Sequence, residues 1–275
     1  DAQESRGLGD VYKRQVTELL DARVPLSSRN PELNELIASK PHIVLLNKCD
    51  MADEAATRRW KAWFGRQGSP ALAVDCRSGR GLNDYGDTVR ELLRDKIQSN
   101  LEKGMAGRAL RMMVVGIPNT GKSSFINRMA GRSRAKVADR PGVTRQNQWF
   151  AIGGGIELLD TPGVLWPKFD DPEVGNRLAF IGSVKDEVMD VETMAVRLLA
   201  VLGAQYPARL CERYKIDREQ ASQSEPYELL ELIGHKRGML MRGGEIDTER
   251  ASAMLLDEYR AGRLGRITLE FPPAD

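Results

Sequence analysis

The 275-residue sequence contains few cysteines and no long apolar segment. Its three cysteines, Cys49, Cys76 and Cys211, are far apart and form no C-x2-C pair. This pattern argues against a disulfide framework or a zinc site and favours free thiols in a reducing compartment. No apolar run approaches the ~20 residues that span a bilayer. No basic segment followed by an apolar one opens the chain, so we expect a cytoplasmic protein without a membrane span.

The composition is that of a globular protein, with 41% apolar and 29% charged residues, which argues against disorder. The net charge of +2 is unevenly distributed. Residues 181–275 contain 13 Lys and Arg against 17 Asp and Glu, a net charge of −4, whereas the first 180 residues carry +6. If the C-terminal part binds a polyanion, local basic clusters must therefore provide the attraction.

The N-terminal segment differs in character from the rest. Residues 10–15, DVYKRQ, back-translate to a string that resembles the transposon end used to prepare sequencing libraries. We therefore expect residues 1–15 to be adapter read-through joined to a truncated gene, and we exclude them from functional reasoning. The alternative is a natural polar N-terminal segment.

From Val16 onward, short apolar runs alternate with polar loops and helical stretches, which is typical of a mostly parallel sheet with helices on both faces. Residues 148–160, QWFAIGGGIELLD, predict two strands joined by a glycine-rich turn. After Asp171 the apolar residues recur at helical spacing, and one face of the segment 191–203 collects Val191, Met194, Ala195, Leu198, Leu199 and Leu202. We expect an α/β domain at 16–172 and a small all-helical domain at 173–275.

A phosphate-binding loop is predicted at residues 116–123, GIPNTGKS, between an apolar strand and a helical segment. Glycines let such a loop point successive backbone N–H groups at phosphate oxygens, and the following helix adds its N-terminal dipole. Lys122 would bridge the β- and γ-phosphates, and the Ser123 hydroxyl would bind Mg²⁺. The predicted contacts are Gly116, Asn119, Thr120, Gly121, Lys122, Ser123 and Ser124.

The segment 160–163, DTPG, ends an apolar strand and supplies candidates for the metal side of this site. Asp160 would hold Mg²⁺ through water, and the Gly163 N–H would sense the γ-phosphate. Thr144, in RPGVT, would close on Mg²⁺ when the third phosphate is present and release when it is lost. We expect Lys122, Thr144 and Gly163 to take part in catalysis.

A base-recognition loop is predicted at residues 47–50, NKCD, after the apolar run 43–46. The Asp50 carboxylate can accept two parallel hydrogen bonds from the N1–H and exocyclic amine of guanine, a pair that adenine lacks. Asn47 would tie the loops together, and the Lys48 stem would cover the base face. Asp75 and Cys76, in DCRSG, follow another strand, and the Cys76 N–H could reach guanine O6.

The order of these motifs is unusual, because the guanine loop precedes the phosphate loop. All the loops follow strands, so in a parallel sheet they gather at its carboxyl edge whatever their order in the chain. A nucleotide-binding domain can therefore be circularly permuted if its old termini are joined, and the polar connector 94–108 is placed to do so. The chain would then run from DTPG straight into the helical tail, which would link nucleotide state to partner binding.

The motifs in this order, with DARVPLSSRNP, LLDTPGVLWPKF, RLAFIGSVKD and GHKRGMLMRGGEID, resemble the RbgA/YlqF family of circularly permuted GTPases over residues 16–272. The resemblance implies a GTPase that assists assembly of the large ribosomal subunit. Hydrolysis of GTP would be stimulated by the pre-ribosomal particle, and the helical tail would contact rRNA. We expect GTP as the substrate, Mg²⁺ as the cofactor and a monomeric protein.

The resemblance also assigns details of catalysis. Asn119 falls where potassium-activated relatives bind K⁺ beside the phosphates. Val164 falls where Ras-like GTPases carry a glutamine that orients water, which a valine cannot do. The family's proposed substitute is a histidine in a PGHM-like N-terminal segment, and neither His42 nor His235 matches it. We therefore expect this chain to bind GTP well and hydrolyse it weakly.

The candidate RNA-binding residues are Lys236, Arg237 and Arg242, which flank glycines in HKRGMLMRGG. A bend there would set these cations against rRNA phosphates. The alternative is a helix end with solvated basic residues.

Other functions remain open. The chain could be a non-catalytic, GTP-controlled RNA-binding module, or a permuted GTPase acting on a different ribosomal particle. The small-subunit factor with an OB-fold and a zinc site is disfavoured because the sequence lacks a Cys/His cluster and an N-terminal barrel. An ATPase is disfavoured by Asp50.

Overall fold

The computed structural model describes residues 15–37, 40–131, 148–163, 165, 171–184 and 190–273. The chain divides into two compact units: one of Asp1–Asp50, Glu54–Lys168 and Glu270–Asp275, the other of Met51–Asp53 and Phe169–Leu269. We call them the sheet unit and the helical unit. The sequence predicts two continuous domains, 16–172 and 173–275. In the structure, Met51–Asp53 belongs to the helical unit and Glu270–Asp275 to the sheet unit.

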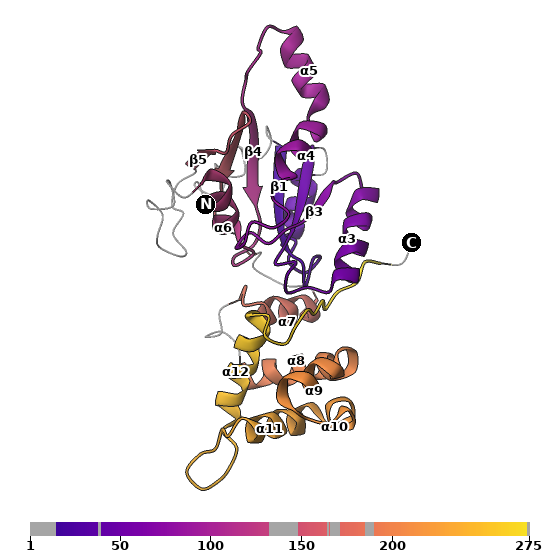
Figure 1. Ribbon diagram of the computed structural model, residues 1–275, viewed down its shortest axis with the longest axis vertical. Coiled ribbons are helices and arrows are strands. Elements are labelled where there is room, and N and C mark those ends of the chain that lie inside the picture. Colours follow the sequence, from indigo (N-terminus) through magenta and orange to yellow (C-terminus); the bar gives the residue numbers. More distant parts are fainter. Residues whose placement is uncertain are drawn as a thin grey trace. The chain divides into compact units, whose positions relative to one another are not determined.

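The sheet unit is built on six strands in the order β3-β2-β1-β4-β6-β5. Their bounds are β1 Gln15–Asp21, β2 His42–Asn47, β3 Ala71–Ala73, β4 Leu110–Val115, β5 Gln148–Ala151 and β6 Ile156–Asp160. All neighbouring pairs are parallel except β5 with β6, which form the predicted hairpin (Figure 1). The prediction of a mostly parallel sheet is therefore confirmed.

Helices cover both faces of this sheet. On one face, α4 (Tyr85–Leu92) and α6 (Lys122–Ala130) pack on a core that includes Leu19, Met112 and Leu158. On the other, α2 (Pro31–Ile37) contributes Ile37 to a smaller core. Successive side chains of β1 point to opposite faces of the sheet, as the strand pleat requires. The helix α3 (Glu54–Arg66) packs beside β3.

The connector between the old termini is partly helical. The segment α5 (Arg94–Glu102) forms a helix whose residues are exposed or half-buried. No proline interrupts residues 94–108, so a polar sequence can continue the helix from α4. Gly104 and Gly107 then take positive φ values of 70° and 80° and turn the chain toward β4.

The helical unit is centred on α8 (Val191–Gln205), whose predicted apolar face is confirmed: all but the half-buried Val191 are buried. The remaining helices are α7 (Pro172–Phe180), α9 (Pro207–Tyr214), α10 (Arg218–Gln223), α11 (Pro226–Lys236) and α12 (Thr248–Arg260). Aspartates cap several of them, as Asp171 does by accepting the Glu173 N–H at 2.8 Å. Among the helices in the described ranges, none has the length and apolar character of a membrane span.

Two short segments far apart in sequence pair within the helical unit. The Ile267 N–H donates to Met51 O at 2.9 Å, and the Asp53 N–H donates to Thr268 Oγ1 at 3.0 Å. The Tyr206 hydroxyl donates to Thr268 O at 2.8 Å. The residues that directly follow the NKCD motif are thus held by the C-terminal segment.

A buried carboxylate ties three helices of the helical unit together. Glu258, on α12, is 5% exposed and accepts hydrogen bonds from the Arg213 guanidinium and, at 2.9 Å, from the Tyr214 hydroxyl. Arg237 lies 3.4 Å from the same carboxylate and stacks over the Tyr214 ring. Burial raises the pKa of Glu258, but the hydrogen bonds and cations outweigh it, so this pKa lies below its usual range.

We expect Glu258→Gln to lower the free energy of unfolding by about 2 kcal/mol at pH 7, because charge-assisted hydrogen bonds become neutral ones. Since the folded pKa lies below the unfolded one, the stabilisation is present above the unfolded pKa and is lost as pH falls through the folded pKa. Urea denaturation over a pH series measures this. The exposed neighbour Asp257 provides the control variant Asp257→Asn. A gap between wild type and Glu258→Gln that stays constant with falling pH would contradict the assignment.

Candidate functional site

The predicted motif loops meet at one edge of the sheet. Strands β1, β2, β4 and β6 are parallel, and they end at Asp21, Asn47, Val115 and Asp160. The guanine loop, the phosphate loop and the DTPG segment begin at these ends. The order of the motifs in the chain therefore does not separate them in space, as the permutation hypothesis requires.

The Asn47 side chain joins three of the loops. It is 4% exposed, its Nδ2 donates to Thr120 O at 2.7 Å, and its Oδ1 accepts the Cys76 N–H at 3.0 Å. The loops after β2, β3 and β4 are thus linked through one amide. Gly121 has a φ of +100°, and a Cβ there would collide with Asn47 Nδ2. Only glycine lets the phosphate loop approach this closely.

The loop after β3 makes hydrogen bonds within the protein. The Cys76 N–H, offered as a donor to guanine O6, donates to Asn47 instead. The Asp75 Oδ1 accepts the Arg77 N–H at 2.8 Å. Burial raises the Asp75 pKa, but hydrogen bonds from Ser78 and Arg77 hold it below its usual range. Asp75 and Cys76 therefore shape the loop and hold Asn47.

The phosphate loop is wrapped around Lys122. Its Nζ donates to Gly116 O and Ile117 O, each at 2.8 Å, and the residue is 8% exposed. Burial lowers the pKa of Lys122 to about 8, against the opposing charge of Asp160. The buried Thr120 hydroxyl donates to Ile117 O at 2.9 Å, and Asn119 adopts a left-handed φ of 63°. The ammonium is thus held within the loop that is predicted to cradle phosphates.

The guanine loop presents a buried carboxylate oxygen. Asp50 Oδ1 is shielded from solvent, and none of the described residues donates a hydrogen bond to it. Such an oxygen is costly unless a ligand supplies the donor. Next to it, Lys48 adopts a φ of 59°, and its Nζ lies 2.9 Å from Asp21 Oδ2. Asp21 belongs to DARVPLSSRNP, which carried the family resemblance but no predicted site role.

The metal side of the site is described in part. Asp160, 8% exposed, ends β6, and Ser123 is exposed in the first turn of α6. A Cβ on Gly163 would lie 2.6 Å from Lys122 Nζ, so the DTPG segment lies against the phosphate-loop lysine. A hydroxyl and one carboxylate, completed by phosphate oxygens and water, fit Mg²⁺. The described residues hold no cluster of three His, Cys, Asp or Glu side chains, and Thr144 and Val164 lie outside them.

The predicted RNA-binding residues differ in their surroundings. Lys236 and Arg242 are exposed, and Arg242 lies in the turn closed by the bridge between Leu240 and Ile246. Arg237 is also exposed, but its guanidinium contacts Glu258 and Tyr214. Its charge is already partly compensated, which weakens it as a phosphate ligand.

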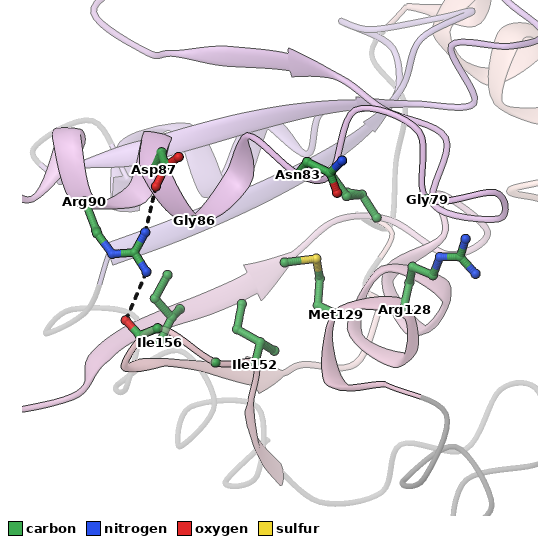
Figure 2. Close-up of a pocket in the computed structure, with 12 residues that line it drawn as sticks. Gly79, Asn83, Gly86, Asp87, Arg90, Arg128, Met129, Ile152 and Ile156 are labelled. Carbon is green, nitrogen blue, oxygen red and sulfur yellow. Dashed lines mark hydrogen bonds and ion pairs between the residues drawn. The ribbon is translucent and has the colours of Figure 1, made fainter.

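A separate pocket of the sheet unit is lined by α4, α6 and the β5–β6 turn (Figure 2). In it, the side chains of Met129, Ile152 and Ile156 face the hollow. Arg90 bonds Asp87 at 2.8 Å and donates to Gly154 O at 3.3 Å, which fixes the hairpin turn to α4. Apart from Gly79 of DCRSG, the pocket is lined by other residues than those of the nucleotide motifs.

Comparison with known proteins agrees with this geometry. A family model described as "50S ribosome-binding GTPase" matches residues 111–228. The match starts within β4, so the NKCD motif lies outside it. This is expected for a permuted chain in which the guanine loop precedes the phosphate loop. Ribosome biogenesis GTPase A of Bacillus cereus is 45% identical over 94% of this chain and 86% of its own length. The protein of that name from Thermotoga maritima is 30% identical over the same shares of both chains.

Solved structures of similar fold point to the same family. The GDP-bound and GNP-bound structures of YlqF from T. maritima have TM-scores of 0.68 and 0.69. Both are 27% identical in sequence and cover at least 98% of this chain and 99% of their own. With relatives of 45% identity along nearly its whole length and a matching permuted fold, the chain belongs to the ribosome biogenesis GTPase A family, RbgA/YlqF.

Proposed function

We propose that this protein binds GTP with Mg²⁺, hydrolyses it to GDP and phosphate, and acts as a nucleotide-dependent switch in assembly of the large ribosomal subunit. Its partner is a pre-ribosomal particle in the cytoplasm, with Lys236 and Arg242 contacting rRNA. The proposal rests above all on Asp50 Oδ1, the buried oxygen that lacks a donor among the described residues. Family membership supports the ribosomal role, because the relatives are named for ribosome biogenesis.

The base is chosen by Asp50. A carboxylate accepts the N1–H and 2-amino groups of guanine together. The Asn47 junction links the loop that carries Asp50 to the phosphate loop. An adenine would leave the buried oxygen without a donor, and that cost sets the selectivity.

The phosphates are held by the loop and Lys122. The two carbonyl bonds of Lys122 Nζ give way to phosphate oxygens when the nucleotide enters, and the charge then acts on the β- and γ-phosphates. Gly163 lies against the same lysine, and its N–H would sense the γ-phosphate. Ser123, Asp160 and Thr144 would hold Mg²⁺, which neutralises charge on the phosphates when bound.

We expect Asp50→Asn to lower GTP affinity about 1,000-fold, roughly 4 kcal/mol, through loss of two charge-assisted hydrogen bonds. The amide can donate to the 2-oxo group of xanthine, so affinity for xanthosine triphosphate should rise. Fluorescence titration of both nucleotides measures the change. The exposed Asp84 gives the control Asp84→Asn, which should leave both affinities unaltered. Equal losses for both nucleotides in Asp50→Asn would argue against base recognition by Asp50.

GTP turnover by the chain alone should be slow and should rise at least about tenfold on adding large ribosomal subunits, as trans-acting stimulation of GTPases does. Small subunits provide the particle control, and Lys122→Ala provides the catalytic control. A parallel sample carries a PGHM-like N-terminal extension, which tests the family's histidine. Equal stimulation by both subunits would contradict a large-subunit role, and binding without turnover in any sample would favour the non-catalytic module.

Potassium activation is tested at Asn119. We expect turnover to fall about tenfold, or 1.4 kcal/mol, when Na⁺ replaces K⁺, because the smaller ion fits the site beside the phosphates poorly. Asn119→Gly keeps the left-handed backbone at φ 63° but removes the side chain. This variant should turn over at the same rate in both salts. A variant that keeps the full potassium effect would exclude Asn119 as the ligand.

A further inference from the structure

A buried ion cluster lies at the end of β1, next to the start of the guanine loop. Asp21, at the end of β1, is fully buried, and Arg23 is 1% exposed. The Arg23 guanidinium donates to both carboxylate oxygens, with Nε at 2.9 Å from Oδ1 and Nη2 at 2.8 Å from Oδ2. This two-point contact fixes the orientation of the carboxylate.

The carboxylate has a second cationic partner, Lys48. Its Nζ lies 2.9 Å from Asp21 Oδ2, although the Lys48 side chain is 22% exposed and could extend into solvent. Burial raises the pKa of Asp21, but Arg23 and Lys48 outweigh it and hold the pKa far below its usual range. Asp21 is therefore ionised at neutral pH, and its charge is available to hold the lysine.

The backbone also directs the Lys48 side chain. Its φ of 59° is a left-handed conformation that non-glycine residues seldom adopt. The Ala22 N–H donates to Asn47 O at 2.8 Å, so the residues before Lys48 are fixed to the end of β1. With one end set by this turn and the other by Asp21, the methylene stem is held in place within the loop that carries Asp50.

The loop behind Asp21 is itself anchored. The Asp21 N–H donates to Ser28 Oγ at 3.0 Å. The Glu270 carboxylate accepts the Leu26 N–H at 2.8 Å and the Ser27 N–H at 3.0 Å. The sheet unit thus uses its C-terminal segment to hold the loop that supports the buried cluster.

We propose that Asp21 is a positioning residue for nucleotide binding: with Arg23 as its counterion, it tethers the Lys48 ammonium so that the lysine stem covers the face of the bound base. This inference rests on the proposed guanine site. The stem contacts the face of the purine, whereas Asp50 contacts its edge. Asp21 therefore governs affinity for any purine, Asp50 governs the choice of base, and neither acts on the phosphates.

The test uses the full chain and four probes: GDP, ADP, inosine diphosphate, which lacks the 2-amino group, and inorganic tripolyphosphate. Asp21→Asn keeps the shape of the side chain and removes its charge. We expect it to weaken GDP and inosine diphosphate by the same factor, about tenfold, and to leave tripolyphosphate binding unchanged. Asp87→Asn is the control, since it removes an exposed aspartate paired with Arg90.

A second variant keeps the proposal testable if Asp21→Asn folds poorly. Lys48→Met retains an apolar stem but removes the tethered ammonium, and it should weaken both nucleotides to a similar extent. The double variant should lose no more than either single one, because both changes break the same link. Additive losses, or an equal loss of tripolyphosphate binding, would overturn the proposal. A wild type that fails to prefer GDP over ADP would instead refute the guanine site itself.

Discussion

The Asn47 amide is the interaction on which the site depends. One buried side chain donates to the phosphate loop and accepts from the loop after β3, so three loops share a single junction. An amide can do this because it carries a donor and an acceptor on the same rigid group. A carboxylate at this position could accept but not donate, and the phosphate loop would lose its link. The permuted chain order leaves this junction intact, because the strands still end at the same edge.

The mostly parallel sheet and the gathering of the motif loops at one of its edges could be predicted from the sequence because the informative residues are contiguous. GIPNTGKS and NKCD each lie on one strand–loop segment, and the hairpin at 148–160 is a local turn. What could not be predicted depends on partners distant in sequence. The acceptor of the Cys76 N–H comes from β2, and the partner of Arg237 is Glu258 on α12.

Each unit contains a buried carboxylate with cationic partners: Asp21 in the sheet unit and Glu258 in the helical unit. Glu258, on α12, gathers two cations and a phenol from α9 and the end of α11 and stabilises the helical unit. Asp21 gathers Arg23 and Lys48, and the second of these is exposed enough to contact a ligand. Burying a carboxylate is expensive unless it is paired and hydrogen-bonded, which both are. The difference lies in the surroundings: the Arg213 and Arg237 side chains are each 31% exposed at the surface of the helical unit, whereas the Asp21 cluster adjoins the proposed guanine site.

The exchange of segments between the two units affects how the chain can be divided. The backbone passes from one unit to the other at 50/51, 53/54, 168/169 and 269/270. Neither unit is therefore a continuous piece that could be excised with two cuts. A fragment that stops at 168 would lose Glu270 and leave the Leu26 and Ser27 N–H groups without their acceptor. It would also carry Met51 and Asp53 without Ile267 and Thr268. Dissection of this protein must therefore supply Glu270 to the sheet unit and keep Ile267 and Thr268 together with Met51 and Asp53 in the helical unit.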